Sequence, residues 1–240
     1  MSWVVEALGP TLARVARDQA AAKEHRASCS QTPCETCERY LCRKCQGPAG
    51  GSRLCDACHR TNRLARLTDQ VPRRFHWAMG ATVTELAKRV KGSSELLTRA
   101  ITAPPLADVV LLGDTGAGKT SLVVAMLHAW CAADLERLDE VRFVTGWQLS
   151  AARGRQPLGQ GEAPDVLEAM HAPLLVLDDL GSERDDRHNG ISDTIMFRHA
   201  EGLPTWVTTG FDAAECVSRY GSGVTRRLFE GSRLVRLGAK

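Results

Sequence analysis

The chain has 240 residues, of which 43% are hydrophobic and 25% are charged, and its formal net charge is +3. This length and apolar content suffice for one α/β domain and a small additional module, and they exclude a chain that is basic throughout. No window holds the roughly 18 consecutive apolar residues of a membrane span. The first residues lack a basic segment followed by an apolar run, so we expect a cytoplasmic protein with no membrane partner.

Charge is distributed unevenly along the chain. Residues 1–100 carry 17 Lys and Arg against 9 Asp and Glu, whereas residues 101–240 carry 14 against 19. This asymmetry suggests a basic appendage able to meet an acidic partner or nucleic acid, attached to a more acidic catalytic body. A small module with much surface would show the same local excess of charge, and the composition leaves both interpretations open.

Residues 1–27 predict an amphipathic helix. Apolar residues such as Trp3, Leu8 and Leu12 recur near helical spacing, and Arg, Lys and Glu occupy the other face. Gly9-Pro10 is expected to break or kink this helix.

Residues 28–62 predict a zinc-binding module. They hold seven of the nine cysteines, arranged as Cys-x-x-Cys pairs that let two thiolates approach one tetrahedral ion from a tight turn. In a reducing compartment such pairs indicate metal rather than disulfides, and a module this small needs the metal to stay folded. The expected zinc ligands are Cys34, Cys37, Cys42, Cys45, Cys55 and Cys58.

The number of zinc ions is open. One ion could use the first and last pairs, in a ribbon-like C-x2-C-x17-C-x2-C arrangement. Two ions could use all three pairs, with Cys29 and His59 completing eight ligands. Two ions are favoured slightly, because a single ion leaves Cys42 and Cys45 unused. Such thiolate sites are closed and structural, so we expect the module to bind a partner.

Residues 63–104 predict a basic helical linker that ends at Ala103-Pro104-Pro105. From residue 105 to 240 the pattern alternates between strands and helices, which predicts an α/β domain with a parallel sheet flanked by helices. The expected strands are 106–112, 141–145, 174–177, 204–209 and 234–237.

A phosphate-binding pattern follows the first of these strands. The sequence matches G-x-x-x-x-G-K-[ST] between an apolar strand and a helical stretch, as a P-loop requires. Backbone amides and the helix N-terminus would cradle the phosphates of ATP, Lys119 would reach the β- and γ-phosphates, and the Thr120 hydroxyl would ligate Mg²⁺. The residues expected to bind the nucleotide are Gly113, Asp114, Thr115, Gly116, Ala117, Gly118, Lys119, Thr120 and Ser121.

Two acidic residues follow the apolar run 174–177. Asp178 and Asp179 stand where a strand neighbouring the P-loop strand is expected to end. Asp178 is expected to hold the hydrated Mg²⁺, and Asp179 to orient or deprotonate the attacking water. Cys131 and Cys216 lie alone in apolar or helical surroundings and are expected to be buried thiols.

Four segments follow one another in the chain: GDTGAGKTS, LLVLDDLG, PTWVTTGF and VTRRL. In the order and spacing of these segments, the chain resembles the AAA+ ATPases of the DnaC/DnaI helicase-loader and IstB transposition-helper family. The resemblance covers residues 72–238 and implies an AAA+ P-loop NTPase fold, self-assembly through the ATPase domain and binding of single-stranded DNA. It also implies that Arg227 acts as an arginine finger on a neighbouring copy. The Arg- and Gly-containing segment 150–163 is a candidate DNA-binding loop, or else an ordinary mobile surface loop.

One position departs from this family. Its polar sensor, usually Asn after two threonines, corresponds to Gly210 here. Either Thr208 or Thr209 then contacts the γ-phosphate, or hydrolysis is slow and ATP acts mainly as an assembly switch.

These observations favour an ATP-dependent loader of the replicative DNA helicase, whose zinc module holds the helicase while the ATPase domain assembles on single-stranded DNA. Small amino-terminal zinc domains occur in DnaI-type loaders, and IstB-type helpers generally lack them. The alternatives are an ATPase helper of DNA transposition, with a transposase as partner, and a nucleotide-gated adaptor with little turnover.

Overall fold

The computed structural model describes residues 64–157, 159–183 and 190–238. The expected amino-terminal helix and the cysteine pairs lie outside these ranges. Residues Arg66–Lys240 belong to one compact unit. Its helices and strands are α4 (Leu67–Gln70), η1 (Arg73–Ala78), α5 (Val83–Ala87), α6 (Ser94–Thr102), β1 (Val109–Leu112), α7 (Lys119–Ala133), η2 (Leu135–Asp139), β2 (Val141–Thr145), α8 (Gly146–Arg155), α9 (Pro164–His171), β3 (Leu174–Leu180), α10 (Gly190–Ala200), β4 (Thr205–Thr209), α11 (Ala213–Phe229) and β5 (Arg233–Arg236).

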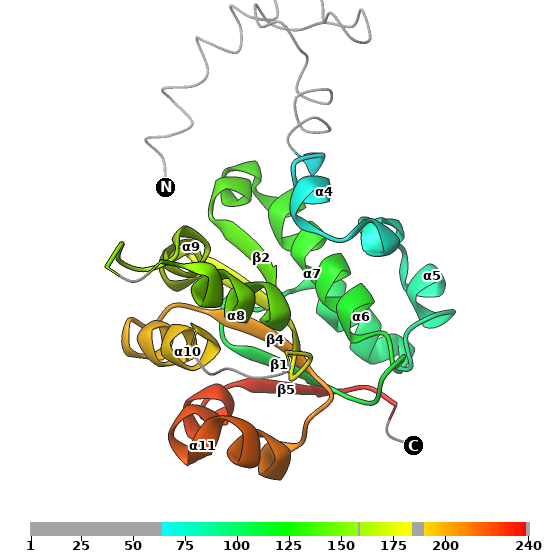
Figure 1. Cartoon of the computed structure of the whole chain (residues 1–240). Coiled ribbons are helices and arrows are strands. Elements are labelled where there is room, and N and C mark those ends of the chain that lie inside the picture. The colour runs from blue at the N-terminus through cyan, green and yellow to red at the C-terminus, as the bar shows by residue number, and fades with distance from the viewer. Residues whose placement is uncertain (1–63, 158, 184–189, 239–240) are drawn as a thin grey trace, which may run out of the picture. The chain divides into compact units, whose positions relative to one another are not determined.

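The five strands form one parallel sheet with the order β2-β3-β4-β1-β5. Helices cover both of its faces (Figure 1), which confirms the predicted α/β fold with a parallel sheet. The strand expected at 174–177 extends to Leu180 and therefore contains both Asp178 and Asp179. Its pairing with β4 shifts in register between Leu177 and Leu180.

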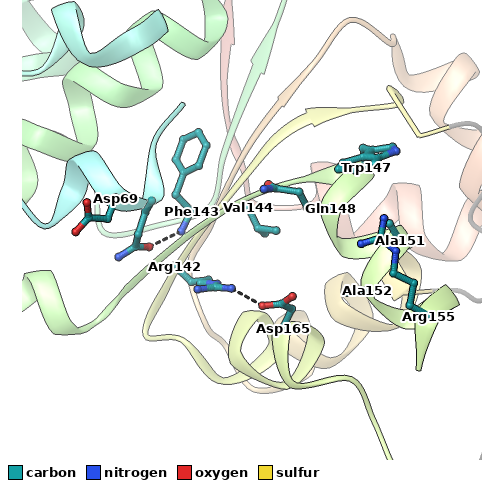
Figure 2. Close-up of a pocket in the computed structure, with 11 residues that line it drawn as sticks. Asp69, Arg142, Phe143, Val144, Trp147, Gln148, Ala151, Ala152, Arg155 and Asp165 are labelled. Carbon is teal, nitrogen blue, oxygen red and sulfur yellow. Dashed lines mark hydrogen bonds and ion pairs between the residues drawn. The ribbon is translucent and has the colours of Figure 1, made fainter. Parts of the chain in front are cut away.

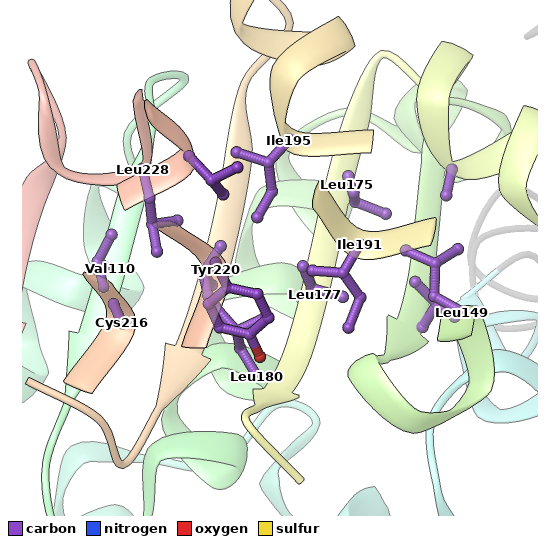
Figure 3. Close-up of a cluster of buried hydrophobic side chains, with 14 of the residues drawn as sticks. Val110, Leu149, Leu175, Leu177, Leu180, Ile191, Ile195, Cys216, Tyr220 and Leu228 are labelled. Carbon is purple, nitrogen blue, oxygen red and sulfur yellow. The ribbon is translucent and has the colours of Figure 1, made fainter. Parts of the chain in front are cut away.

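One face of the sheet packs against α8, α9, α10 and α11. Alternate strand residues such as Val110, Leu175 and Leu177 point to this side and are buried there. Figure 3 shows them beneath side chains of the helices, among them Ile191 and Tyr220. Because both faces of a parallel sheet are covered, its strands are apolar along their length, which is why the sequence showed them as continuous apolar runs.

The other face packs against α7, which is buried along most of its length. Trp130 of α7 meets Trp206 of β4 edge to face, with ring centroids 6.5 Å apart. The Trp206 indole N–H donates a hydrogen bond to the Ala107 carbonyl oxygen at 3.1 Å, so this large side chain is buried without an unpaired donor.

Residues 66–102, which the sequence predicted as part of a helical linker, form four short helices that pack with α7 and the sheet (Figure 1). Each interruption has a local cause: Pro72 precedes η1, Gly80 has a left-handed φ of 73°, and Thr82 and Ser93 cap the next two helices. Leu67, Leu86 and Leu97 are among the side chains buried in this way. In the described ranges, no helix is long and apolar enough to span a bilayer.

Candidate nucleotide-binding site

The phosphate loop, residues Gly113–Ser121, connects the carboxyl end of β1 to α7. Two of its three glycines are required by close backbone approaches: a Cβ on Gly113 would lie 2.4 Å from the Leu237 carbonyl oxygen, and one on Gly118 would lie 2.8 Å from Val90 Cα. Gly118 also has a left-handed φ of 94° and begins α7 without a side-chain cap. The first amides of α7 therefore have no capping side chain and can bind an anion.

Lys119 is held at this loop. Its ammonium donates hydrogen bonds to the carbonyl oxygens of Gly113 at 2.6 Å and Asp114 at 3.0 Å, and the residue is only 9% exposed. Burial lowers the pKa of Lys119, and the carboxylates of Asp179, Asp178 and Asp114 act in the opposite direction. The positive charge of Lys119 therefore lies over the phosphate loop. Oxygens of a bound phosphate would replace the two carbonyl oxygens as hydrogen-bond partners of the ammonium.

Asp178 lies beside the loop and receives two hydroxyl hydrogen bonds on the same oxygen. Thr120 donates at 2.9 Å and Thr208 at 2.7 Å. Asp178 is 3% exposed, and burial raises its pKa while the bonds from Thr208 and Thr120 lower it. A hydroxyl and a carboxylate placed together are hard oxygen ligands of the kind that Mg²⁺ takes from proteins, so this pair fits the metal.

Asp179 is exposed and has a left-handed backbone, with a φ of 56° that is unusual for a residue other than glycine. Its amide donates to the Thr208 hydroxyl oxygen at 2.8 Å, and its carbonyl oxygen accepts from the Ser182 amide at 3.1 Å. The strained residue lies where the register of β3 shifts against β4. Such strain is common at functional positions, where the surroundings hold it in place.

The two threonines considered as sensors have different surroundings. Thr208 contacts both aspartates of the site, whereas Thr209 donates to the Leu180 carbonyl oxygen at 2.9 Å and accepts from the Phe211 amide at 3.0 Å. A Cβ on Gly210 would have only the Gly113 carbonyl oxygen within 4 Å, at 3.9 Å. Of the two threonines, Thr208 is therefore the one that contacts the two aspartates beside the phosphate loop.

Two backbone segments that the sequence did not single out also lie against the phosphate loop. The Lys91 amide donates to the Ala117 carbonyl oxygen at 3.0 Å, and the Lys91 carbonyl oxygen accepts from the Gly238 amide at 2.8 Å. The Leu237 amide donates to the Leu112 carbonyl oxygen at 2.8 Å. These contacts are made by main-chain atoms, which any residue possesses, so no side-chain pattern could have indicated them.

Arg227 lies on α11, remote from the phosphate loop of its own chain. It is half-buried, and its guanidinium donates to the Gly223 carbonyl oxygen at 2.9 Å. It lines a small pocket with Asp108 and Thr205, at the amino ends of β1 and β4, whereas the phosphate loop follows the carboxyl end of β1. Any contact of Arg227 with a nucleotide would therefore have to be made in a second copy of the chain.

The candidate DNA-binding loop at 150–163 is partly helical, which corrects the sequence-based expectation. Residues 150–155 complete α8, and Arg153 is ion-paired with Glu162 and Asp193. These carboxylates neutralise Arg153, so it is a poor contact for a phosphate backbone.

Arg155 and Trp147 of α8 border a separate pocket of about 360 Å³ beside the edge strand β2 (Figure 2). Trp147 is 53% exposed, and the Arg155 guanidinium lies 5.9 Å from its ring centroid. Across the pocket, Arg142 is ion-paired with Asp165 at 2.7 Å, and the Phe143 amide donates to the Gln70 side chain at 3.1 Å. With acidic and basic groups both present, the pocket shows no preference for an anion.

The predicted zinc ligands cannot be placed, because the six cysteines lie outside the described residues. Within the described ranges, no group of three or more His, Cys, Asp or Glu residues could hold a metal ion. Cys131 and Cys216 are free and buried, as expected. Burial raises the pKa of the Cys131 thiol to about 12 and that of Cys216 to about 11.

Comparison with known proteins rests on structure, since neither the family models nor the curated proteins contain a match to this sequence. The structure of the DnaC helicase loader superposes with a TM-score of 0.54 and 22% identity, over 69% of this chain and 99% of the other. The chain shares its fold. The structure of DnaI is similar as well, with a TM-score of 0.52 and 19% identity, over 70% of this chain and 94% of DnaI. At these identities the comparison establishes the fold that the chain shares with DnaC and DnaI.

Proposed function

We propose that the chain binds ATP with Mg²⁺ at the phosphate loop and hydrolyses it. The observation that carries this proposal is the junction of Lys119, Thr120, Asp178 and Thr208 at the carboxyl ends of β1, β3 and β4. Bound Mg²⁺ would supply charge neutralisation on the phosphates, with Thr120 and Asp178 as its protein ligands.

The remaining residues of the site have separable tasks in this proposal. The loop amides and Lys119 bind and orient the phosphates, whereas Asp179 orients the attacking water and accepts its proton. Thr208 hydrogen-bonds to both aspartates and so holds them in their relative positions. Arg227 acts on the nucleotide of a neighbouring copy, which makes hydrolysis dependent on self-assembly.

We further propose that ATP controls the loading of a replicative DNA helicase on single-stranded DNA. The support is the fold shared with proteins described as the DnaC helicase loader and DnaI. In this proposal the cysteine-rich module, residues 28–62, binds zinc and holds the helicase. The ATP-bound and ADP-bound states would differ in their affinity for these partners, which is how hydrolysis would release them.

The test is a pulldown of the full-length, zinc-loaded chain against the replicative helicase of its own host, with ATP, with ADP and without nucleotide. We expect nucleotide-dependent capture that is lost in a Cys34→Ser, Cys37→Ser double variant. No capture in any nucleotide state would contradict the loader proposal. In that case a second pulldown against a transposase of the same host tests the transposition helper, which nucleotide-dependent capture would support.

A nucleotide-gated adaptor with little turnover is a second candidate, favoured by Gly210, which has no side chain to contact a γ-phosphate. Single-turnover hydrolysis with and without single-stranded DNA separates the two. Stimulation by DNA supports the loader, whereas tight ATP binding with negligible hydrolysis in both conditions supports the adaptor.

A further inference from the structure

A buried carboxylate lies four residues beyond Asp179 and belongs to none of the motifs. The Glu183 side chain is only 1% exposed. Its Oε2 accepts from the Gly181 amide at 3.1 Å, and its Oε1 accepts from the Tyr220 hydroxyl and from the Arg219 guanidinium, the latter at 3.3 Å. Arg219 also donates to the Glu183 carbonyl oxygen. A carboxylate buried in this way is retained only with such partners, and these come from two separate parts of the chain.

The turn that Glu183 closes is the one that carries Asp179. Asp179 and Gly181 both have left-handed φ values, 56° and 99°, and the Ser182 amide donates to the Asp179 carbonyl oxygen at 3.1 Å. A non-glycine residue in this conformation costs free energy and persists only where neighbouring contacts enforce it. Through its bond to the Gly181 amide, the Glu183 side chain supplies such a contact from inside the turn.

The start of α8 and Phe211, the second residue after β4, close around the same turn. A Cβ on Gly146, the first residue of α8, would lie 2.9 Å from Glu183 Oε2 and 3.4 Å from the Asp179 carbonyl oxygen. A Cβ on Gly181 would lie 2.7 Å from the Phe211 ring. The turn therefore has little room to relax, and a substitution of Glu183 would change the position of Asp179.

Helix α11 connects this turn to the core. The Tyr220 ring belongs to the buried cluster between the sheet and its covering helices (Figure 3), with its hydroxyl on Glu183. Burial and the hydrogen bond to Glu183 raise the pKa of Tyr220, so it remains a protonated donor. Directly after it, Gly221 leaves helical geometry with φ 82° and ψ 161°, so Arg219 and Tyr220 end the first half of α11.

We propose that Glu183 is a positioning residue for ATP hydrolysis, which with Arg219 and Tyr220 holds the Asp179 turn so that the carboxylate of Asp179 meets the attacking water. This inference rests on the proposed ATPase function. It predicts an effect on the hydrolytic step, because the hydrogen bonds and ion pairs of Glu183 go to Gly181, Arg219 and Tyr220 and not to Lys119, Thr120 or Asp178 of the phosphate loop and its metal site. If Glu183 and its partners only stabilised the fold, their loss would leave the rate at which bound ATP is hydrolysed unchanged.

The experiment compares Glu183→Gln with the wild-type chain in single-turnover hydrolysis, ATP binding, and binding of ADP with aluminium fluoride, a mimic of the transferring phosphoryl group. We expect the rate and the affinity for the mimic to fall about tenfold or more, since small misplacements of reacting groups have large effects. ATP affinity is expected to stay within about twofold of wild type, because the phosphate cradle is intact.

Tyr220→Phe provides a milder second variant, which keeps the buried ring and removes one donor to Glu183. For this variant we expect the hydrolysis rate to fall severalfold, while the affinity for ATP is kept. Glu168→Gln is the matched control: it removes a carboxylate that pairs with Arg142 at 3.1 Å on the surface of α9, and its rate should equal that of wild type.

The outcomes separate the two proposals. If wild type hydrolyses ATP and the Glu183→Gln and Tyr220→Phe variants keep its rate within about twofold, the positioning role is wrong and the ATPase function stands. A parallel loss of ATP affinity and rate would also overturn it, since that indicates general disruption of the site. If wild type binds no ATP or shows no hydrolysis, the ATPase proposal fails and this inference fails with it.

Discussion

The Thr120 hydroxyl and the Asp178 carboxylate meet at 2.9 Å, although 58 positions separate them in the chain. The contact is possible because β1 and β3 are parallel strands of one sheet with β4 between them. Residues that follow parallel strands meet at one edge of the sheet, so a loop after β1 and an acidic residue late in β3 become neighbours.

Lys119→Ala should weaken ATP binding by about 100-fold or more, because charge-assisted hydrogen bonds to the phosphates contribute about 1.5–3 kcal/mol each. The fold should survive, since Gly113 is half-buried and Asp114 is exposed, so that water can take the place of the ammonium at their carbonyl oxygens. Nucleotide titration calorimetry measures the loss, with circular dichroism as the control for folding. Retained affinity would refute the phosphate-loop assignment.

Asp178→Asn should stabilise the empty protein at neutral pH. Burial raises the pKa of Asp178 above its unfolded value, so its contribution to stability is fully present below the unfolded pKa and is lost as pH rises through the folded pKa. Asparagine does not ionise and so avoids this loss. Thermal unfolding from pH 4 to 8 without nucleotide should show a higher midpoint for the variant at the upper end of the range.

The same variant should lose stabilisation by Mg²⁺ and ATP. A ligand at 100 times its dissociation constant stabilises the folded state by about 2.7 kcal/mol. Wild type should show this gain, and Asp178→Asn much less of it, because one of the two protein ligands of the metal is gone. An equal gain in both proteins would remove Asp178 from the metal site.

Thr208→Val and Thr209→Val form a matched pair on β4. Each removes one buried hydroxyl with two hydrogen bonds, so each should lower the free energy of unfolding by about 1–3 kcal/mol. Thr208→Val should in addition slow hydrolysis about tenfold or more, since both aspartates lose a partner, while Thr209→Val keeps the wild-type rate per folded molecule. Equal rates in the two variants would exclude Thr208 as the residue that takes over from the missing sensor.

Arg227→Ala should leave ATP affinity unchanged and remove assembly-dependent hydrolysis, because this residue lies far from the phosphate loop of its own chain. Mixing it with Lys119→Ala should restore activity at interfaces where an intact Arg227 meets an intact loop. Arg226→Ala is the control, since Arg226 pairs with Glu230 on the exposed side of α11. If mixed variants stay inactive, the action in trans is wrong.

Zinc removal should unfold residues 28–60 and leave ATP binding intact. Circular dichroism before and after chelation checks the first statement, with metal content by mass spectrometry as the control that zinc was present and has been removed, and calorimetry checks the second. Replacing Cys34 and Cys37 by Ser should lower the zinc content, whereas replacing Cys131 and Cys216 should not, because these two thiols are buried in the unit that contains the sheet. A full-length chain that holds no zinc would refute the module.

Several features of the site could be anticipated from local residue patterns. The phosphate loop needs its glycines, lysine and threonine in adjacent positions, so the whole motif is visible in nine residues. The strands of a parallel sheet are apolar on both faces, which made β1, β3 and β4 recognisable as short runs. The expectation of a loop at 150–163 was wrong in part, because this segment has no such local pattern. Helix α8 continues through Arg153, and the carboxylates that pair with Arg153 are 9 and 40 positions away in the chain.

The α/β class, the phosphate-loop motif and the two candidate aspartates could thus be inferred from the residues alone, because each depends on residues that are close together in the chain. The folded chain was needed to show that Thr208 rather than Thr209 adjoins Asp178, that Lys91 and Leu237 lie against the loop, and that α11 shields Glu183 from water. These contacts join distant parts of the chain through backbone atoms or single hydrogen bonds, and they exist only after the sheet has assembled. A carboxylate such as Glu183 is unremarkable in the sequence until the fold removes it from water.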